Sequence, residues 1–168
     1  ALRQAIDPRT RVFVLCNPHN PVGRVFSRAE LEAIGDVCLR HDVLICSDEI
    51  HCDLIYAGHR HTPIASLAPE IAARTVTLMA PSKTFNIAGL QCAFAVIPDE
   101  NLRRRFRAAG AGLVPEPNIL ALTAAEAAYR SGEEWLAALL RYLEGNRAHV
   151  AERVRHSLPG VRIVPPED

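Results

Sequence analysis

The sequence feature that most constrains the fold is a strand, helix and strand pattern near the start of the chain. Arg11–Cys16 is a short, almost continuous apolar run, which is typical of a central strand covered on both faces. Ser27 and Glu30 match a capping box, and apolar residues recur behind them at helical spacing as far as about residue 41. Val43–Cys46 is a second buried run. Together they predict a βαβ unit with two parallel strands and a right-handed crossover.

Further patterns extend this α/β reading along the chain. Thr75–Ala80 is short and rich in β-branched residues, so it is predicted to be a strand. The link Ile87–Leu90 is too short for a crossover helix, so the next apolar run, Gln91–Ile97, is expected to lie antiparallel or at a distance. Helices are predicted after the N-cap residue Asp99 and over residues 117–129 and 133–156, and a last strand is predicted over 160–164.

Composition limits the class of protein. The chain has 168 residues, of which 49% are hydrophobic and 23% charged, which favours one soluble globular domain or slightly more. Nineteen basic residues balance nineteen acidic ones, so bulk charge gives no support for nucleic acid or an anionic membrane as a partner. The one basic cluster, Arg103–Arg107, is interpreted as a solvated helix surface rather than a phosphate-binding patch. No run is long enough to span a bilayer, and no signal peptide opens the chain.

The cysteines and histidines predict neither disulfides nor a metal site. Five cysteines without C-x-x-C spacing are typical of buried free thiols in a reducing compartment, so the predicted location is the cytoplasm. His59 and His61 lack cysteine or carboxylate partners at ligand spacing, which disfavours a metal. The first residue is Ala1 rather than methionine, and the chain ends just after the last expected strand, so we expect a piece of a longer protein.

Lys83 directly follows the expected strand Thr75–Ala80. An ammonium group in an apolar setting is costly unless it is paired or loses its proton, and a lysine with a depressed pKa is what amine nucleophiles and Schiff bases require. The alternative is a lysine whose stem lies along the strand end while its amine reaches water. The stretch alone does not decide between them.

Two other expected strands also end in polar residues. The stiff loop Asn17–Gly23 follows the first strand, and Ser47–His51 follows the second. Open α/β sheets bind ligands at the carboxyl ends of their strands, so we expect Asn20, Asp48 and Lys83 to converge there.

Each of these residues suits one part of pyridoxal phosphate. Lys83 can form an imine with the aldehyde, and Asp48 can pair with a protonated pyridine nitrogen. Asn20 can donate to the oxygen beside the imine, and the hydroxyls of Ser82 and Thr84 lie within reach of a phosphate. Simpler roles remain open for single residues: Asn20 and Ser82 as turn residues, and Asp48 as a helix cap.

Three motifs resemble fold-type I pyridoxal-phosphate enzymes of the aminotransferase class I/II family. They are Asn-Pro-His-Asn-Pro-Val-Gly at residues 17–23, Ser-Asp-Glu-Ile-His at 47–51 and Ala-Pro-Ser-Lys-Thr-Phe-Asn-Ile-Ala-Gly-Leu at 80–90. His19, His51 and the wording around Lys83 are similar to the cystathionine β-lyase branch, the MalY/PatB-type C-S lyases. The resemblance implies a three-layer αβα large domain with a mostly parallel sheet, of which this chain is a part, followed by a long connector helix.

The resemblance also implies roles for single residues. Lys83 corresponds to the Schiff-base lysine, Asp48 to the partner of the pyridine nitrogen, and Asn20 to the residue at the 3'-oxygen. Ser82 lies near the phosphate in such enzymes. His51 stands where many relatives carry a tyrosine that reaches the 3'-oxygen.

The resemblance further implies a domain division and missing parts. Residues 1–132 would belong to the cofactor-binding large domain, and 133–168 to the connector helix and the start of the small domain. Gln91 stands where aminotransferases commonly place a phosphate-binding arginine, and its neutral amide favours the lyase branch. The phosphate loop, the ring that stacks on the pyridine and the arginine that binds the substrate carboxylate have no counterpart here. Such enzymes usually form homodimers.

The predicted function is therefore a carbon–sulfur β-lyase that cleaves cystathionine or a related cysteine S-conjugate to a thiol, pyruvate and ammonia. The substrate would be a small amino acid, and no nucleic acid or membrane partner is expected. An aminotransferase is the main alternative. Release of pyruvate from cystathionine without a keto-acid acceptor would separate the two activities. A non-catalytic fragment, or a regulatory role through protein contacts, is the alternative of another class.

Overall fold

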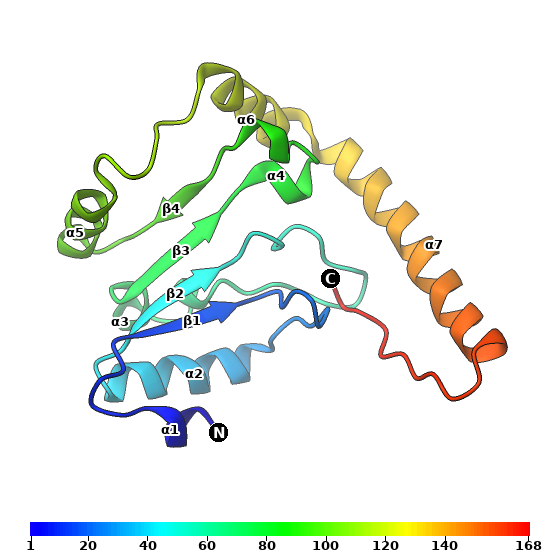
Figure 1. Cartoon of the computed structure of the whole chain (residues 1–168), viewed down its shortest axis with the longest axis horizontal. Helices are drawn as coiled ribbons and strands as arrows, with labels where there is room; N and C mark the ends of the chain where they lie inside the picture. The colour runs from blue at the N-terminus through cyan, green and yellow to red at the C-terminus, as the bar shows by residue number, and fades with distance from the viewer.

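The computed structural model describes all residues 1–168, and it confirms the α/β class (Figure 1). Its sheet has four strands in the order β1-β2-β3-β4. Their bounds are β1 Val12–Cys16, β2 Leu44–Asp48, β3 Thr75–Met79 and β4 Phe94–Val96. β1, β2 and β3 run parallel, whereas β4 pairs with β3 in the antiparallel sense. The short link before β4 leaves no room for a crossover, and the sheet takes the antiparallel option that the sequence left open.

Helices begin and end close to where the sequence predicts them. Ser27 Oγ accepts the Glu30 N–H, and the Glu30 carboxylate accepts the Ser27 N–H, so the capping box of α2 is confirmed. Asp99 caps α5 with a single side-chain bond, in which it accepts the Leu102 N–H at 2.7 Å. No helix has both the length and the apolar character needed to cross a membrane. The helices are α1 Leu2–Ala5, α2 Arg28–Arg40, α3 Pro69–Ala72, α4 Pro81–Thr84, α5 Glu100–Gly110, α6 Ile119–Ser131 and α7 Glu133–Ser157, with short 3-10 turns at Ile64–Ser66 and Ala88–Leu90.

The core lies between one face of β1 and β2 and the elements that pack on it, mainly α2 and α3. Gly35 of α2 makes this packing close, because a Cβ there would lie 2.5 Å from Ile71 Cδ1 of α3. Burial of this close-packed cluster holds β1 and β2 against the helices and so positions the ends of these two strands. Its members are Leu15, Leu31, Cys38, Val43, Ile45, Ile64 and Ile71.

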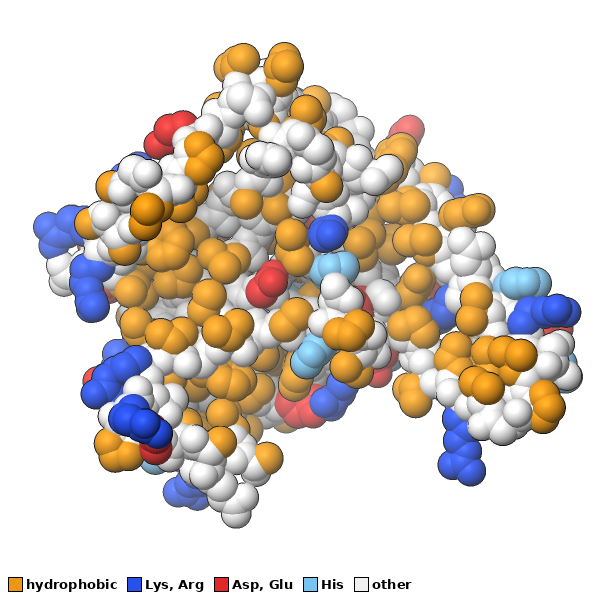
Figure 2. All heavy atoms as spheres, viewed as in Figure 1, with side chains coloured by type: hydrophobic (Ala, Val, Ile, Leu, Met, Phe, Trp, Pro, Cys, Tyr) orange, Lys and Arg blue, Asp and Glu red, His pale blue; other side chains and the backbone are white.

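The prediction that the first strand is central and covered on both faces is wrong within this chain. β1 lies at the edge of the sheet, and Val12 and Val14 are 50% and 67% exposed. Phe94 and Val96 of β4, at the other edge, are also exposed. Phe94 has one aromatic neighbour, since its ring centre lies 6.1 Å from that of Tyr129 in α6, but Val12, Val14 and Val96 remain about half exposed or more. Figure 2 shows apolar side chains gathered over the middle of this view.

The strand predicted over 160–164 is also wrong. Residues 158–168 form neither helix nor strand, because they do not lie along an edge of the sheet, where they could find backbone partners. Figure 1 shows this segment returning from the far end of α7 to the tips of β1 and β2. There the Glu167 N–H donates to Gly23 O at 2.7 Å, and Glu167 O accepts the Tyr56 N–H at 3.1 Å.

Candidate active site

The carboxyl ends of the three parallel strands meet at one edge of the sheet. Cys16 pairs in register with Asp48, and Asp48 with Leu78. The ladder continues past the strands, since the Asn17 N–H donates to Asp48 O and the Glu49 N–H to Leu78 O, both at 3.0 Å. In Figure 1 the heads of β1, β2 and β3 point toward α7. The structure therefore brings together the three strand ends from which the candidate site residues follow.

Asn20 and His51 line one pocket of about 300 Å³. The loop that carries Asn20 is closed by two backbone bonds of 2.8 Å, from the His19 N–H to Arg24 O and from the Gly23 N–H to His19 O. Leu140 of α7 forms part of the opposite wall. The side chains of Asn20 and His51 thus reach the same space from two strand ends, which the predicted motifs require.

The last residue, Asp168, lies in the same pocket. Its carboxylate is only 5% exposed, and Oδ2 lies 3.9 Å from Nδ1 of His51. Oδ1 has no hydrogen-bond partner, and burial raises the pKa of Asp168. His51 therefore has an acidic neighbour, a contact that the sequence pattern did not predict.

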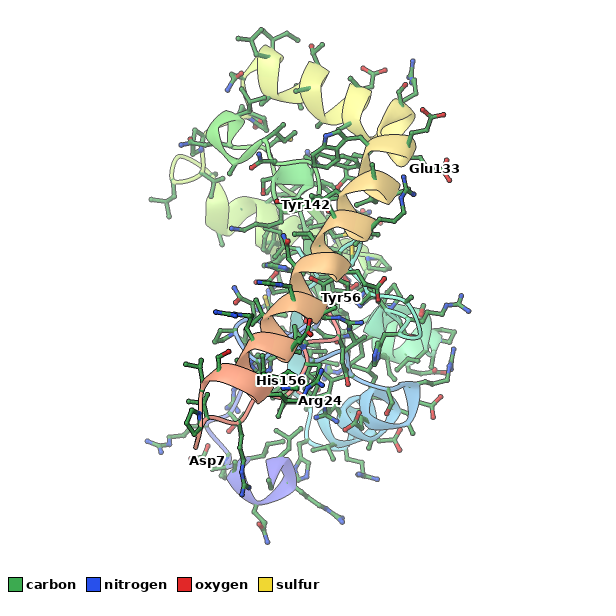
Figure 3. The ribbon with its side chains drawn as sticks, turned by 90° about the vertical axis from the view of Figure 1, so that its right-hand side faces the viewer. Asp7, Arg24, Tyr56, Glu133, Tyr142 and His156 are labelled. Carbon is green, nitrogen blue, oxygen red and sulfur yellow. The ribbon has the colours of Figure 1, made fainter.

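Tyr56 holds the tail that carries Asp168. The guanidinium carbon of Arg147 lies 4.4 Å from the centre of the Tyr56 ring, and the same guanidinium donates to Pro166 O at 2.8 Å. Figure 3 shows Tyr56 beside the middle of α7. The pocket is thus closed on one side by contacts among the loop after β2, the helix and the tail.

Asp48 is partly buried at the end of β2. Its Oδ1 accepts the Ile50 N–H at 3.2 Å, the local contact of an aspartate in a turn. Asp48 therefore caps a turn and not a helix. Its carboxylate makes no ion pair within the chain, which leaves Oδ2 available to a cationic ligand.

Ser82 and Lys83 lie in the single turn of α4, directly after β3. Pro81 begins this helix and is buried, which anchors the turn against the sheet. Lys83 is the only lysine in the chain, and it makes no ion pair. Its side chain is exposed, so the expected apolar setting is not formed by these residues.

Thr84 has a different role from the one its hydroxyl suggested. The residue is fully buried, and Oγ1 donates to Asp53 Oδ2 at 3.0 Å. The hydroxyl is therefore committed to the loop after β2 and is not free to bind a phosphate. The bond instead ties the turn that carries Lys83 to the loop that follows Asp48.

An aromatic cluster packs against Phe85, the residue that follows the single turn of α4. The Phe85 ring lies 5.6 Å from the Tyr129 ring in an edge-to-face arrangement and 6.0 Å from Trp135. Gly132, between α6 and α7, allows this contact, because a Cβ there would lie 2.5 Å from Phe85 Cε1. Two helices far along the chain therefore fix the position of α4.

Gln91 ends the 3-10 turn after α4 and is exposed, with φ of 56°.

Cys52 is not a candidate nucleophile. Burial, together with the nearby carboxylates of Asp53 and Glu49, raises the pKa of Cys52 to about 12, so the thiol keeps its proton. All five cysteines are free thiols.

Sequence reasoning missed two residues beside the site, Glu49 and His61. Glu49 is 1% exposed, and its Oε2 lies 2.8 Å from Nε2 of His61. One signal was available: neighbouring residues at a strand end point to opposite faces, so Asp48 and Glu49 cannot both face the ligand. No group of three or more His, Cys, Asp or Glu side chains is arranged to hold a metal ion.

Comparisons with known proteins identify the family of this chain. The family model described as aminotransferase class I and II matches residues 1–168. The cystathionine beta-lyase PatB of Bacillus subtilis is 47% identical over 165 residues, which are 96% of this chain and 42% of the relative. The aspartate aminotransferase of Geobacillus stearothermophilus is 35% identical over 99% of this chain and 42% of its own length. A crystal structure of the PLP-bound C-S lyase from Staphylococcus hominis superposes with a TM-score of 0.86 at 38% identity, covering 94% of this chain and 39% of that one.

The similarity extends along nearly the whole chain, but the chain spans only about 42% of the length of the two curated relatives. The match to the family model nevertheless covers every residue, including the three strand ends described above. The chain therefore belongs to the aminotransferase class I and II family.

Proposed function

We propose that this chain carries the cofactor-attaching part of a pyridoxal-phosphate-dependent carbon–sulfur β-lyase. The substrate would be cystathionine or a related cysteine S-conjugate, and the products a thiol, pyruvate and ammonia. The observation that supports this most is the position of the only lysine, Lys83, in the turn of α4 after β3, at the sheet edge where Asp48 ends β2 and Asn20 lies in the loop after β1. PatB, the cystathionine beta-lyase, is 47% identical, and PLP-bound C-S lyases are among the similar structures.

The residues at this edge fit the chemistry of pyridoxal phosphate. A primary amine, an unpaired carboxylate and a carboxamide are the groups that an aldehyde, a pyridinium nitrogen and a phenolate oxygen require. Lys83, Asp48 and Asn20 supply one each, and none of the three is tied up in an ion pair within the chain. Ser82 and His51 would assist at the phosphate and at the phenolate oxygen.

Each residue has a defined task in the proposed reaction. Pyridoxal phosphate, when bound, supplies an electron sink that stabilises negative charge at the substrate α-carbon. The Asp48 carboxylate would keep the pyridine nitrogen protonated, and the Asn20 amide would orient the ring through its oxygen. With the cofactor bound, the Lys83 amine, once freed by the substrate amine, would remove the α-proton as a general base, so that thiolate could leave from the β-carbon.

The deciding experiment uses the fact that the chain has one lysine. The chain is incubated with pyridoxal phosphate and reduced with borohydride, and the adduct is mapped by mass spectrometry. We expect one adduct, on Lys83, and none on a Lys83→Arg variant, which keeps the charge but not the nucleophilic amine. An adduct found only on the α-amine of Ala1, or in equal amounts on both proteins, would contradict the proposal.

An aminotransferase is the second candidate, supported by the 35% identity to an aspartate aminotransferase. The two activities differ in what they need. The lyase releases pyruvate from cystathionine alone, whereas a transaminase requires a keto-acid acceptor. Pyruvate formation by the whole enzyme in the absence of an acceptor therefore distinguishes them.

The assembly, location and domain division are also proposed. We infer a homodimer for the whole enzyme, a cytoplasmic location consistent with the five free thiols, and a boundary near residue 132, where α6 gives way to α7. Light scattering after size exclusion tests the dimer, because a mass of one subunit contradicts it. Limited proteolysis tests the boundary, which should be cut first if it joins two domains.

A further inference from the structure

Glu49 is a carboxylate that the proposed reaction does not use, and it is almost completely buried. Burying an ionised carboxylate costs several kcal/mol unless its oxygens are paired. Here Oε1 accepts the Ser47 hydroxyl at 2.8 Å and the Ile64 N–H at 3.4 Å, while Oε2 lies 2.8 Å from His61 Nε2. The carboxylate is thus held from three sides.

The direction of each hydrogen bond around His61 follows from one fixed donor. The Phe26 backbone N–H can only donate, and it lies 3.0 Å from Asn17 Oδ1, so Nδ2 of Asn17 is the donor of that amide. Nδ2 lies 3.5 Å from His61 Nδ1, which must then accept. His61 Nε2 therefore carries the proton and donates it to Glu49. Only the neutral Nε2–H tautomer satisfies every contact.

This network connects the two loops that carry site residues. Asn17, which is 1% exposed, begins the loop that presents Asn20, and Glu49 is the residue after Asp48. Because Asp48 and Glu49 leave the strand end on opposite faces, fixing Glu49 also fixes the backbone that aims Asp48. Phe26, at the entry to α2, is held by the same amide of Asn17.

We propose that Glu49 and His61 are positioning residues, which set the relative placement of Asn20 and Asp48 through the chain Glu49–His61–Asn17. Both side chains are nearly buried, and neither is among the residues proposed to bind the cofactor. The inference rests on the proposed function only in assigning Asn20 and Asp48 to cofactor binding.

The first test reads the tautomer and needs no cofactor. Nitrogen-15 NMR of the histidine rings should find His61 neutral with its proton on Nε2. In a Glu49→Gln variant the new amide N–H can donate to Nε2 of His61. The ring proton then moves to Nδ1, where it faces the donor Nδ2 of Asn17. A proton on Nδ1 of His61 in the wild-type chain, or no change in Glu49→Gln, overturns the proposed network.

The second test measures cofactor affinity by borohydride trapping on Lys83 at increasing pyridoxal phosphate. We expect His61→Gln and Glu49→Gln each to raise the apparent dissociation constant about tenfold, the effect of losing one charge-assisted hydrogen bond, and the double variant to add little more. His59→Gln is the matched control in the same loop, since His59 is half-exposed and lies outside the network.

A loss of stability alone must be distinguished from a loss of positioning. Thr75→Val removes a buried hydrogen bond of 2.7 Å to Ile71 O at the opposite end of the sheet, so it should lower stability and leave the apparent affinity unchanged. Equal affinity in wild type, His61→Gln and Glu49→Gln overturns the positioning role. No trapping on Lys83 in the wild type instead contradicts the proposed function, and the tautomer test still stands.

Discussion

At the scale of single residues, the candidate site separates side chains that are proposed to bind the cofactor from side chains that hold the backbone. Asn20, Asp48 and Lys83 make few or no contacts within the chain, whereas Thr84, Glu49 and Asn17 are buried and satisfied. A ligand site needs both kinds, because groups that bind must be free and yet held at fixed positions.

Asp48→Asn tests the task proposed for the Asp48 carboxylate. The amide is nearly isosteric and can still accept the Ile50 N–H, so the turn should survive. It cannot stabilise a protonated ring nitrogen, so we expect the whole enzyme to lose turnover about a hundredfold or more while keeping most of its cofactor. Turnover and cofactor absorbance are measured on the same preparation. Equal losses of both would identify Asp48 as a structural residue.

The strand ends that carry the proposed cofactor-binding residues could be predicted from the sequence, whereas the contacts of the buried residues could not. Asp48 ends a strand, Asn20 and Lys83 lie a few residues after one, and these positions are visible in the pattern of apolar runs. The partners of Glu49 and Thr84 come from loops of irregular sequence, at His61 and Asp53, and no periodicity predicts which loop residue reaches which strand end.

At the scale of elements, local signals fixed the helices well. The capping box of α2 was predicted from two residues and is present, because both of its bonds lie within one turn. Strands depend on neighbours that the local sequence does not specify. Residues 160–164 have a strand pattern without a partner, and β1 has a partner on one side only.

The capping box of α2 should make stability depend on pH in a defined range. Bonds from the Ser27 N–H and hydroxyl, together with Arg24, lower the pKa of Glu30 from 4.5 to about 2. Because the folded-state pKa is depressed, this stabilisation is complete above pH 4.5 and is lost as the pH falls through about 2.

The measurement is the difference in urea midpoint between wild type and Glu30→Gln across that range of pH. We expect the difference to shrink as the pH falls from 4.5 toward 2. Glu32→Gln controls for the loss of one negative charge, since Glu32 pairs with Arg28 on the helix surface and takes no part in the cap. A difference that stays constant down to pH 2 would argue against the cap as its origin.

Two glycines in or beside α7 should respond in opposite directions to the same substitution. A Cβ at Gly132 would meet Ala128 O and lie 2.5 Å from Phe85 Cε1, so Gly132→Ala should destabilise by about 1–3 kcal/mol. Gly145 has open space around it within the helix, so Gly145→Ala should stabilise by about 0.5–1 kcal/mol. Thermal unfolding followed by circular dichroism compares them. Two shifts of the same sign would show that the Phe85 contact does not constrain the junction.

At the scale of the whole molecule, α7 and the tail determine how the strand ends are enclosed. No residue of α7 is fully buried, and the helix packs on the rest of the chain through few contacts. Two of its residues, Leu140 and Leu143, line the pocket beside Asn20 and His51. The tail closes the arrangement by pairing with the loop of Gly23 and with Tyr56. Enclosure of the site therefore depends on segments far apart in the sequence, which is why sequence patterns alone did not predict it.

Arg147 is the residue on which this closure depends most. Its guanidinium stacks on Tyr56 and donates to Pro166 O, so it joins the helix to both the loop after β2 and the tail. In an Arg147→Ala variant we expect faster hydrogen exchange at the N–H groups of Tyr56 and Glu167, which bond the tail to the rest of the chain. Arg141→Ala, on the exposed part of the same helix, is the control and should leave both rates unchanged. Unchanged exchange in Arg147→Ala would mean that the backbone bonds of Glu167 hold the tail without the guanidinium.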